Sequence, residues 1–241
     1  VNGEQKERIM HKATIKPEHI ETVIRRGGKK HSVESLKGSA TALVVVDMQI
    51  YFMGEGQPSE CPIAREIVPN INQLADATRR AGGLVIWIQT HSGPESQDFW
   101  SAYYDRMTSE NSMKRVRGMS PGGSGFDLWP ELDVHDQDKI VPKTRYSAFI
   151  PSPSKLESVL KEHNIDTLLI TGVSTCTCCE STARDGMMLN YRTMMISDGC
   201  AAPDDDLHNN SINQFYLQFG DVQSTEEVIA LLNQNIAAAA E

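Results

Sequence analysis

The chain has 241 residues, and its 32 Asp and Glu against 23 Lys and Arg give a formal net charge of −9 at pH 7. This acidic balance argues against nucleic acid or an anionic membrane surface as the main partner. No window approaches the roughly 20 apolar residues of a membrane span, and the charged residues 1–26 lack the apolar middle of a signal peptide. The five cysteines, an odd number, do not suggest a secreted disulfide framework. We therefore expect a soluble, cytoplasmic protein that binds neither nucleic acid nor membrane.

The beginning of the chain differs in composition from the rest. Residues 1–37 are polar and dense in Lys, Arg and Glu. We expect an N-terminal arm here, which either packs on the body or on a neighbouring subunit or is loosely held. Residues 38–241 show no repeat of fixed period and no linker, so we expect a single domain over that range.

Short apolar runs and helical spacings alternate along the domain. The first run, 42–46, is rich in β-branched residues, as is typical of a strand buried on both faces. A helix is expected to begin at Pro62 and to end at Gly82, because proline suits a first helical turn and glycine a helix end. The last helix carries a capping box, Ser224 with Glu227. Further strands are expected at 84–88, 139–141, 167–171, 193–196 and 221–223, with another helix from about Ser154.

Strands that alternate with helices indicate a parallel sheet covered on both faces. We therefore predict an α/β fold: a doubly wound, mainly parallel sheet of six strands with helices on both sides, in three Rossmann-like layers. Residues 107–138 are glycine-rich and irregular in pattern. Irregular segments of this length usually have a function, so we expect this one to form a lid or a pocket wall.

Three chemically different side chains follow three of the predicted strands. Asp47 follows the first, Lys143 the third and Cys178 the fourth, and ligands of such sheets bind beyond the carboxyl ends of the strands. Alone, each has an ordinary explanation as a turn former, a solvated charge or a small buried side chain. Together they match a nucleophile, a cation and a general acid–base. A thiol in the first turn of a helix and near an ammonium is expected to have a lowered pKa.

The neighbouring cysteines allow other readings. Cys176 and Cys179 have the C-x-x-C spacing of a dithiol redox site, which would leave Asp47 and Lys143 without a role. The crowded thiols are a poor zinc site, which needs three or four well-spaced ligands. Adjacent helical residues point about 100° apart, so if Cys178 faces the crevice, Cys179 packs away from it.

Three blocks of the sequence resemble the isochorismatase-like cysteine hydrolases, which include N-carbamoylsarcosine amidase, ureidoacrylate amidohydrolase and biuret hydrolase. The blocks are LVVVDMQ at 43–49, Lys143 with RYSAF at 145–149, and 171–185, and the similarity extends over about residues 38–236. The resemblance implies a catalytic triad of Asp47, Lys143 and Cys178. It also implies a cis peptide between Val173 and Ser174, and an oxyanion hole formed by the backbone amides of Ser174 and Cys178.

The chain departs from the family pattern at several positions. Cys179 stands at a usually apolar position and Cys176 at an Asn-like one, and 89–91 read Gln-Thr-His where nicotinamidases carry a metal-binding Asp-x-His. We therefore expect neither a metal nor another cofactor.

These observations predict a metal-independent cysteine amidohydrolase that cleaves the C–N bond of a small amide, carbamoyl or ureido compound through a thioester on Cys178. The alternatives are an isochorismatase-type or nicotinamidase-type hydrolase, a non-catalytic binding protein, and a Cys176/Cys179 redox protein. The family implies a homo-oligomer, expected to be a homotetramer. An anionic substrate would need a cation, for which Arg145 or an arginine within 106–117 is a candidate. The candidate substrate contacts are Gln49, Phe52, Trp100, Arg145, Tyr146 and Gln214.

Overall fold

The apolar runs of the sequence form one sheet of six parallel strands in the computed structural model, which describes residues 10–151 and 153–238. The strand order is β3-β2-β1-β4-β5-β6, and each neighbouring pair is parallel. The predicted doubly wound α/β fold is thereby confirmed. The strands are β1 (Thr41–Val46), β2 (Leu84–Thr90), β3 (Lys139–Lys143), β4 (Thr167–Val173), β5 (Arg192–Ala201) and β6 (Asp221–Gln223).

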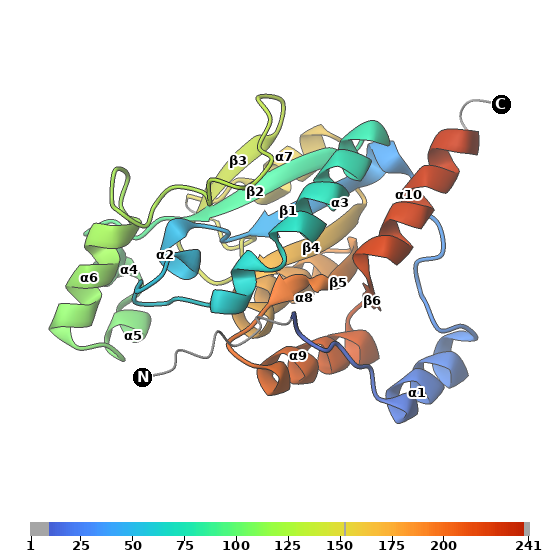
Figure 1. Ribbon diagram of the computed structural model, residues 1–241, viewed down its shortest axis with the longest axis horizontal. Helices are drawn as coiled ribbons and strands as arrows, with labels where there is room; N and C mark the ends of the chain where they lie inside the picture. Colours follow the sequence, from blue (N-terminus) through green and yellow to red (C-terminus); the bar gives the residue numbers. More distant parts are fainter. Residues whose placement is uncertain (1–9, 152, 239–241) are drawn as a thin grey trace, which may run out of the picture.

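Helices cover both faces of this sheet, and Figure 1 shows α3 and α10 side by side across one of them. Three short turns, η1 (Gly38–Ala40), η2 (Pro62–Arg65) and η3 (Thr175–Cys179), complete the connections. The helices are α1 (Pro17–Gly27), α2 (Ile50–Met53), α3 (Val68–Arg80), α4 (Ser96–Phe99), α5 (Ser101–Tyr104), α6 (Ser109–Met119), α7 (Leu156–Glu162), α8 (Glu180–Met188), α9 (Asp205–Gln218) and α10 (Thr225–Ala238).

The two layers of core follow from the alternation of side chains along β1. Leu43 and Val45 pack in a cluster with apolar residues of α3 and α10. Ala42, Val44 and Val46 point to the opposite face and pack with residues of α7, α8 and α9. Because every residue of β1 is buried, this strand reads as a continuous apolar run, as expected in the middle of a parallel sheet.

The ends of β1 and β4 approach each other unusually closely. Gly172 adopts a φ of 110°, and a Cβ atom at this position would overlap the backbone carbonyl oxygen of Val46. Only glycine tolerates both the left-handed backbone and this approach. β1 and β4 are also the strands at which the order of the sheet reverses, so a binding crevice is expected above them.

The predicted start of the helix after β1 differs from the structure. Pro62 begins only the short turn η2, and α3 begins at Val68 with Pro69 in its first turn. A proline is accepted in the first turn of a helix but not in its interior, so Pro69 fixes the later start.

The segment 107–138 is not irregular throughout, because it contains α6. Thr108 caps this helix by accepting a hydrogen bond from the Asn111 amide at 3.2 Å. The buried residues of α6 are Ser112, Arg115, Gly118 and Met119, so the helix has no apolar stripe. Without that stripe its sequence lacks the periodicity by which helices are predicted.

The described part of the N-terminal arm packs along α9. Asn213 accepts a hydrogen bond from the Lys16 amide at 2.8 Å and donates one to the Thr14 carbonyl at 2.7 Å. The ring of His11 stacks on that of His208 with centroids 4.4 Å apart, and His208 lies 3.0 Å from the Thr175 hydroxyl at the start of η3. The arm is thus linked through α9 to the turn that carries Cys178; the rest of the predicted arm, residues 1–9, lies outside the described residues.

Within the described ranges, no helix combines the length and the apolar character that crossing a membrane requires.

Candidate active site

Asp47 occupies the first position after β1 and is almost completely buried, with 1% of its surface exposed. Its backbone has a φ of 55°, and its amide donates to the Ile88 carbonyl at 3.0 Å. The chain therefore leaves the sheet in a left-handed turn at this residue, a conformation that aspartate tolerates better than most residues.

Lys143 is the last residue of β3 and is as deeply buried as Asp47. Its Nζ atom donates to Asp47 Oδ2 at 2.7 Å, to Thr90 Oγ1 at 2.6 Å and to the Arg145 carbonyl at 3.0 Å. All three protons of the ammonium thus have acceptors, as a buried charge requires.

Thr90, at the end of β2, completes this network. Its hydroxyl donates to Asp47 Oδ1 at 2.7 Å while it accepts from Lys143. Each carboxylate oxygen of Asp47 therefore has its own donor, and the orientation of the carboxylate is set by neighbouring strands.

Cys178 lies in η3, a wide π-type turn between β4 and α8. Its Sγ atom is 3.6 Å from Lys143 Nζ, and the Asp47 carboxylate is close enough to raise the pKa of its thiol. Cys179 turns the other way: it is fully buried, and its Sγ atom donates to the Thr171 carbonyl at 3.6 Å. Single-turn π-helical segments are often found at functional sites.

The charges and the burial around Cys178 favour a protonated thiol in the resting state. Burial raises the pKa of Cys178 to about 12; Lys143 acts to lower it, and Asp47 acts to raise it. Burial acts to lower the pKa of Lys143, but the adjacent Asp47 carboxylate outweighs it, so that this pKa is raised. The expectation of a lowered thiol pKa is therefore wrong, because burial and the Asp47 charge together exceed the effect of the lysine.

A pocket of about 420 Å³ opens above Cys178, a size suited to a small ligand. One wall consists of Lys143 and of residues that follow β4, namely Val173, Ser174, Cys176, Thr177 and Cys178. The Val173–Ser174 peptide bond is cis. Cys176 lines the pocket while Cys179 faces the core, an arrangement that does not favour a redox pair.

A second wall of the pocket is aromatic. Trp100 and Tyr103 stack with their ring centroids 4.2 Å apart, and Tyr146 meets Trp100 edge-on at 5.1 Å. Arg145 lies over the Trp100 ring at 5.1 Å and donates to the Phe99 carbonyl at 2.7 Å. Four of the predicted substrate contacts line this pocket: Phe52, Trp100, Arg145 and Tyr146.

The structure does not bring the other two predicted contacts, Gln49 and Gln214, into the pocket. The Gln49 amide is fully buried and fully bonded, donating to the carbonyls of Thr90 and Phe126 and accepting from the Thr90 amide. It holds the end of β2 instead. Gln214 is exposed on α9, whose buried face is formed by its neighbours.

Three residues of the site were not predicted individually: Thr90, Tyr103 and Arg115. For Thr90 a signal existed, since it stands at a strand end like Asp47 and Lys143. Tyr103 and Arg115 lie in segments without a periodic pattern. Over residues 10–151 and 153–238, no three His, Cys, Asp or Glu side chains are grouped closely enough to hold a metal ion.

Comparison with known proteins identifies the family to which the chain belongs. The profile of the isochorismatase domain matches residues 41–227. A ureidoacrylate amidohydrolase, RutB of Klebsiella pneumoniae subsp. pneumoniae, is 32% identical over 171 residues, which cover 66% of this chain and 72% of that protein.

Solved structures show the same similarity. The crystal structure of a cysteine hydrolase from Pseudomonas syringae pv. phaseolicola has a TM-score of 0.76 at 26% identity, covering 84% of this chain and 97% of the other. An N-carbamoylsarcosine amidase from Thermoplasma acidophilum has a TM-score of 0.60 at 24% identity, covering 77% and 96%, and shares the fold.

Proposed function

The chain belongs to the isochorismatase family and is a hydrolase, and we propose that it is a cysteine amidohydrolase with Cys178 as nucleophile. The bond cleaved is the C–N bond of a small amide, carbamoyl or ureido compound. The observation that carries the proposal is the contact between three strand ends, in which Lys143 joins Asp47 at 2.7 Å and Cys178 at 3.6 Å.

The first half of the proposed reaction forms a thioester. Cys178 Sγ attacks the carbonyl carbon while its proton passes to Asp47, since a thiol with a pKa of about 12 needs a base to become a nucleophile. The negative charge on the carbonyl oxygen is stabilised by the backbone amides of Ser174 and Cys178. When the C–N bond breaks, Asp47 returns the proton to the departing nitrogen.

The second half restores the enzyme. Asp47 takes a proton from water, the hydroxide formed attacks the thioester carbon, and the C–S bond breaks as the sulfur recovers a proton. Lys143 remains an ammonium throughout; it stabilises the charge that develops on sulfur and holds the carboxylate in place. No step in this scheme calls for a metal or another cofactor.

The relative from Klebsiella is named for ureidoacrylate, and this places carbamoyl and ureido compounds first among the substrates to be tested. The size of the pocket, about 420 Å³, fits compounds of this class.

The test is a panel of small amides and ureido compounds with ammonia release as the readout. We expect turnover of at least one compound, and an acyl adduct on Cys178 when the reaction is quenched in acid and analysed by mass spectrometry. An adduct on Cys176 or Cys179 instead would overturn the assignment of the nucleophile. Binding of panel members without any turnover would favour a non-catalytic binding protein.

The homotetramer also remains part of the proposal. Sedimentation velocity at micromolar concentration is expected to show a species of four chains, and a monomer alone would contradict it.

A further inference from the structure

Arg115, in the middle of α6, is a buried arginine that has no acidic partner in the described part of the chain. Only 7% of its surface is exposed, and its Nε atom has no hydrogen-bond partner among the described residues. Of the groups that act on the pKa of Arg115 after burial itself, the strongest are three tyrosines and Cys178, and none is a carboxylate.

Such an arrangement is costly in a folded protein. Removing a guanidinium from water is compensated only when ion pairs or hydrogen bonds replace the lost hydration. Here the compensation comes from ring faces, since the guanidinium carbon lies 5.0 Å from the centre of the Tyr103 ring and 5.7 Å from that of Tyr51. Cation–π contacts hold the group in place but leave its N–H donors available to a ligand.

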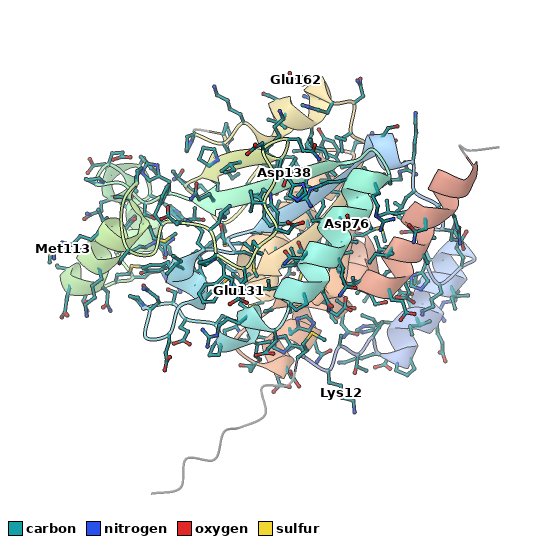
Figure 2. All side chains as sticks on the ribbon, turned by 45° about the horizontal axis from the view of Figure 1, so that its top comes forward. Lys12, Asp76, Met113, Glu131, Asp138 and Glu162 are labelled. Carbon is teal, nitrogen blue, oxygen red and sulfur yellow. The ribbon has the colours of Figure 1, made fainter. Side chains whose placement is uncertain are left out.

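The side chain belongs to the pocket and not to the surface. Arg115 lines the pocket together with Cys178 and Lys143, and its charge acts to lower the pKa of both. Met113, two residues earlier on the same helix, is 48% exposed and lies at the outer edge of the molecule (Figure 2). The helix therefore presents its cation inward.

The other charged groups of the pocket already have partners. Lys143 is paired with Asp47, and Arg145 donates to the Phe99 carbonyl. Glu60 accepts from Arg65 at 2.9 Å and from the Gly56 amide at 2.8 Å. Arg145 also has no carboxylate partner among the described residues, but its guanidinium donates to a carbonyl. Within the described ranges, Arg115 is the pocket cation that combines burial with an unbonded N–H, so an anionic ligand group would supply its missing partner.

We propose that Arg115 binds a carboxylate of the substrate, so that the proposed amidohydrolase acts on amides or ureido compounds that carry a carboxylate at the end away from the scissile carbonyl. This inference rests on the proposed function. A guanidinium presents parallel N–H donors that match the two oxygens of a carboxylate. Tyr103 and Trp100 line the same pocket, and their rings would pack against the apolar part of such a molecule.

The test measures binding in the Cys178→Ala variant, which keeps the ligand intact. The probes are N-carbamoylglycine, N-carbamoyl-β-alanine and N-carbamoyl-γ-aminobutyrate, each compared by calorimetry with its neutral methyl ester. For at least one chain length we expect the acid to bind about tenfold to a hundredfold more tightly than its ester, as for a charge-assisted hydrogen bond. Equal binding of acid and ester at every length would overturn the proposal.

Substitutions then assign the preference to a residue. Adding Arg115→Met to Cys178→Ala should abolish the difference between acid and ester, and Arg115→Lys should retain part of it. The matched control is Arg117→Met, which removes the same charge from the exposed side of α6 and should leave the difference unchanged. An acid preference that survives Arg115→Met in a variant with an unchanged melting curve would also overturn the proposal.

Because this readout needs no turnover, it separates the two proposals. An acid preference that depends on Arg115, in a protein that hydrolyses none of the panel, would support the carboxylate site and count against the amidohydrolase. Turnover of neutral amides without any preference for the acid would support the amidohydrolase and count against the carboxylate site. The rival role for Arg115 is that its charge only changes the pKa of Cys178. In that case, replacing Arg115 would change the rate at which iodoacetamide alkylates Cys178 but not the ratio of acid to ester binding. This result too would overturn the carboxylate site.

Discussion

The two walls of the pocket are built on different principles. The wall of Asp47, Lys143 and Cys178 stands on the ends of three parallel strands, and its polar atoms are bonded to one another. The wall of Trp100 and Arg115 stands on the short helices between β2 and β3 and is held by ring stacking and cation–π contacts. In the proposed mechanism the strand-end wall holds the reacting atoms in place, and the helical wall selects the substrate that reaches them.

The largest effect is expected from the nucleophile itself. Cys178→Ala should lower kcat by about 10⁴-fold or more, as does removal of other catalytic nucleophiles. Cys178→Ser should be nearly inactive as well, because a hydroxyl is harder to ionise than a thiol and no imidazole is at hand. The control is Cys179→Val, which keeps a small apolar side chain in the core and should retain most activity; Cys176→Ser should also retain measurable activity. Full activity in Cys178→Ala would show that Cys178 is not the nucleophile.

The pKa of Cys178 predicts how the free enzyme reacts with an alkylating agent. With a pKa of about 12, the thiolate fraction is very small at pH 7 and grows roughly tenfold per pH unit. The rate of iodoacetamide labelling at Cys178, followed by mass spectrometry, should therefore rise about a thousandfold from pH 7 to pH 10. A plateau already at neutral pH would show that Lys143 outweighs burial.

Thr90 tests whether the strand-end wall works as a unit. Thr90→Val preserves the shape but removes the hydroxyl that joins Asp47 to Lys143. Hydrogen bonds to charged groups contribute about 1.5–3 kcal/mol, so kcat should fall by about tenfold to a hundredfold. Thr90→Ser restores the hydroxyl and should recover most of the loss. An equal loss in both variants would indicate a packing effect instead.

The helical wall should give a smaller effect, confined to binding. Trp100→Leu removes the ring that stacks on Tyr103 and faces Tyr146. We expect KM for a turned-over substrate to rise by about fivefold to tenfold, in line with an aromatic contact of roughly 0.5–1.5 kcal/mol, while kcat stays within a factor of about two. A loss mainly in kcat would mean that this wall also positions the reacting group.

The residues of the strand-end wall could be predicted from the sequence. β1 and β4 are continuous apolar runs, and the residues that follow them fall at a known edge of the sheet. Asp47, Lys143 and Cys178 could therefore be placed together before any coordinates. Helical geometry indicated that Cys178 and Cys179 do not both face the crevice, and the family resemblance selected Cys178; the wide turn η3 was not foreseen.

The helical wall could not be derived in this way. α6 buries Ser112, Arg115 and Gly118, residues that elsewhere mark surfaces or loops. Arg115 lines the pocket, and Gly118 lies against the ring of Tyr51. The raised pKa of the Cys178 thiol was not predicted for a related reason. Proximity of a lysine is visible in a sequence pattern, but the depth at which Cys178 is buried depends on the whole fold.

The stacked imidazoles beneath η3 bear on how a profile of activity against pH would be interpreted. Burial, followed by the charge of His11, lowers the pKa of His208 to about 4. Its ring is therefore neutral over the range in which enzymes are usually assayed, and it adds no charge below the turn that carries the nucleophile. A kinetic limb centred near the ordinary histidine value of about 6.5 would accordingly have to come from a group other than His208.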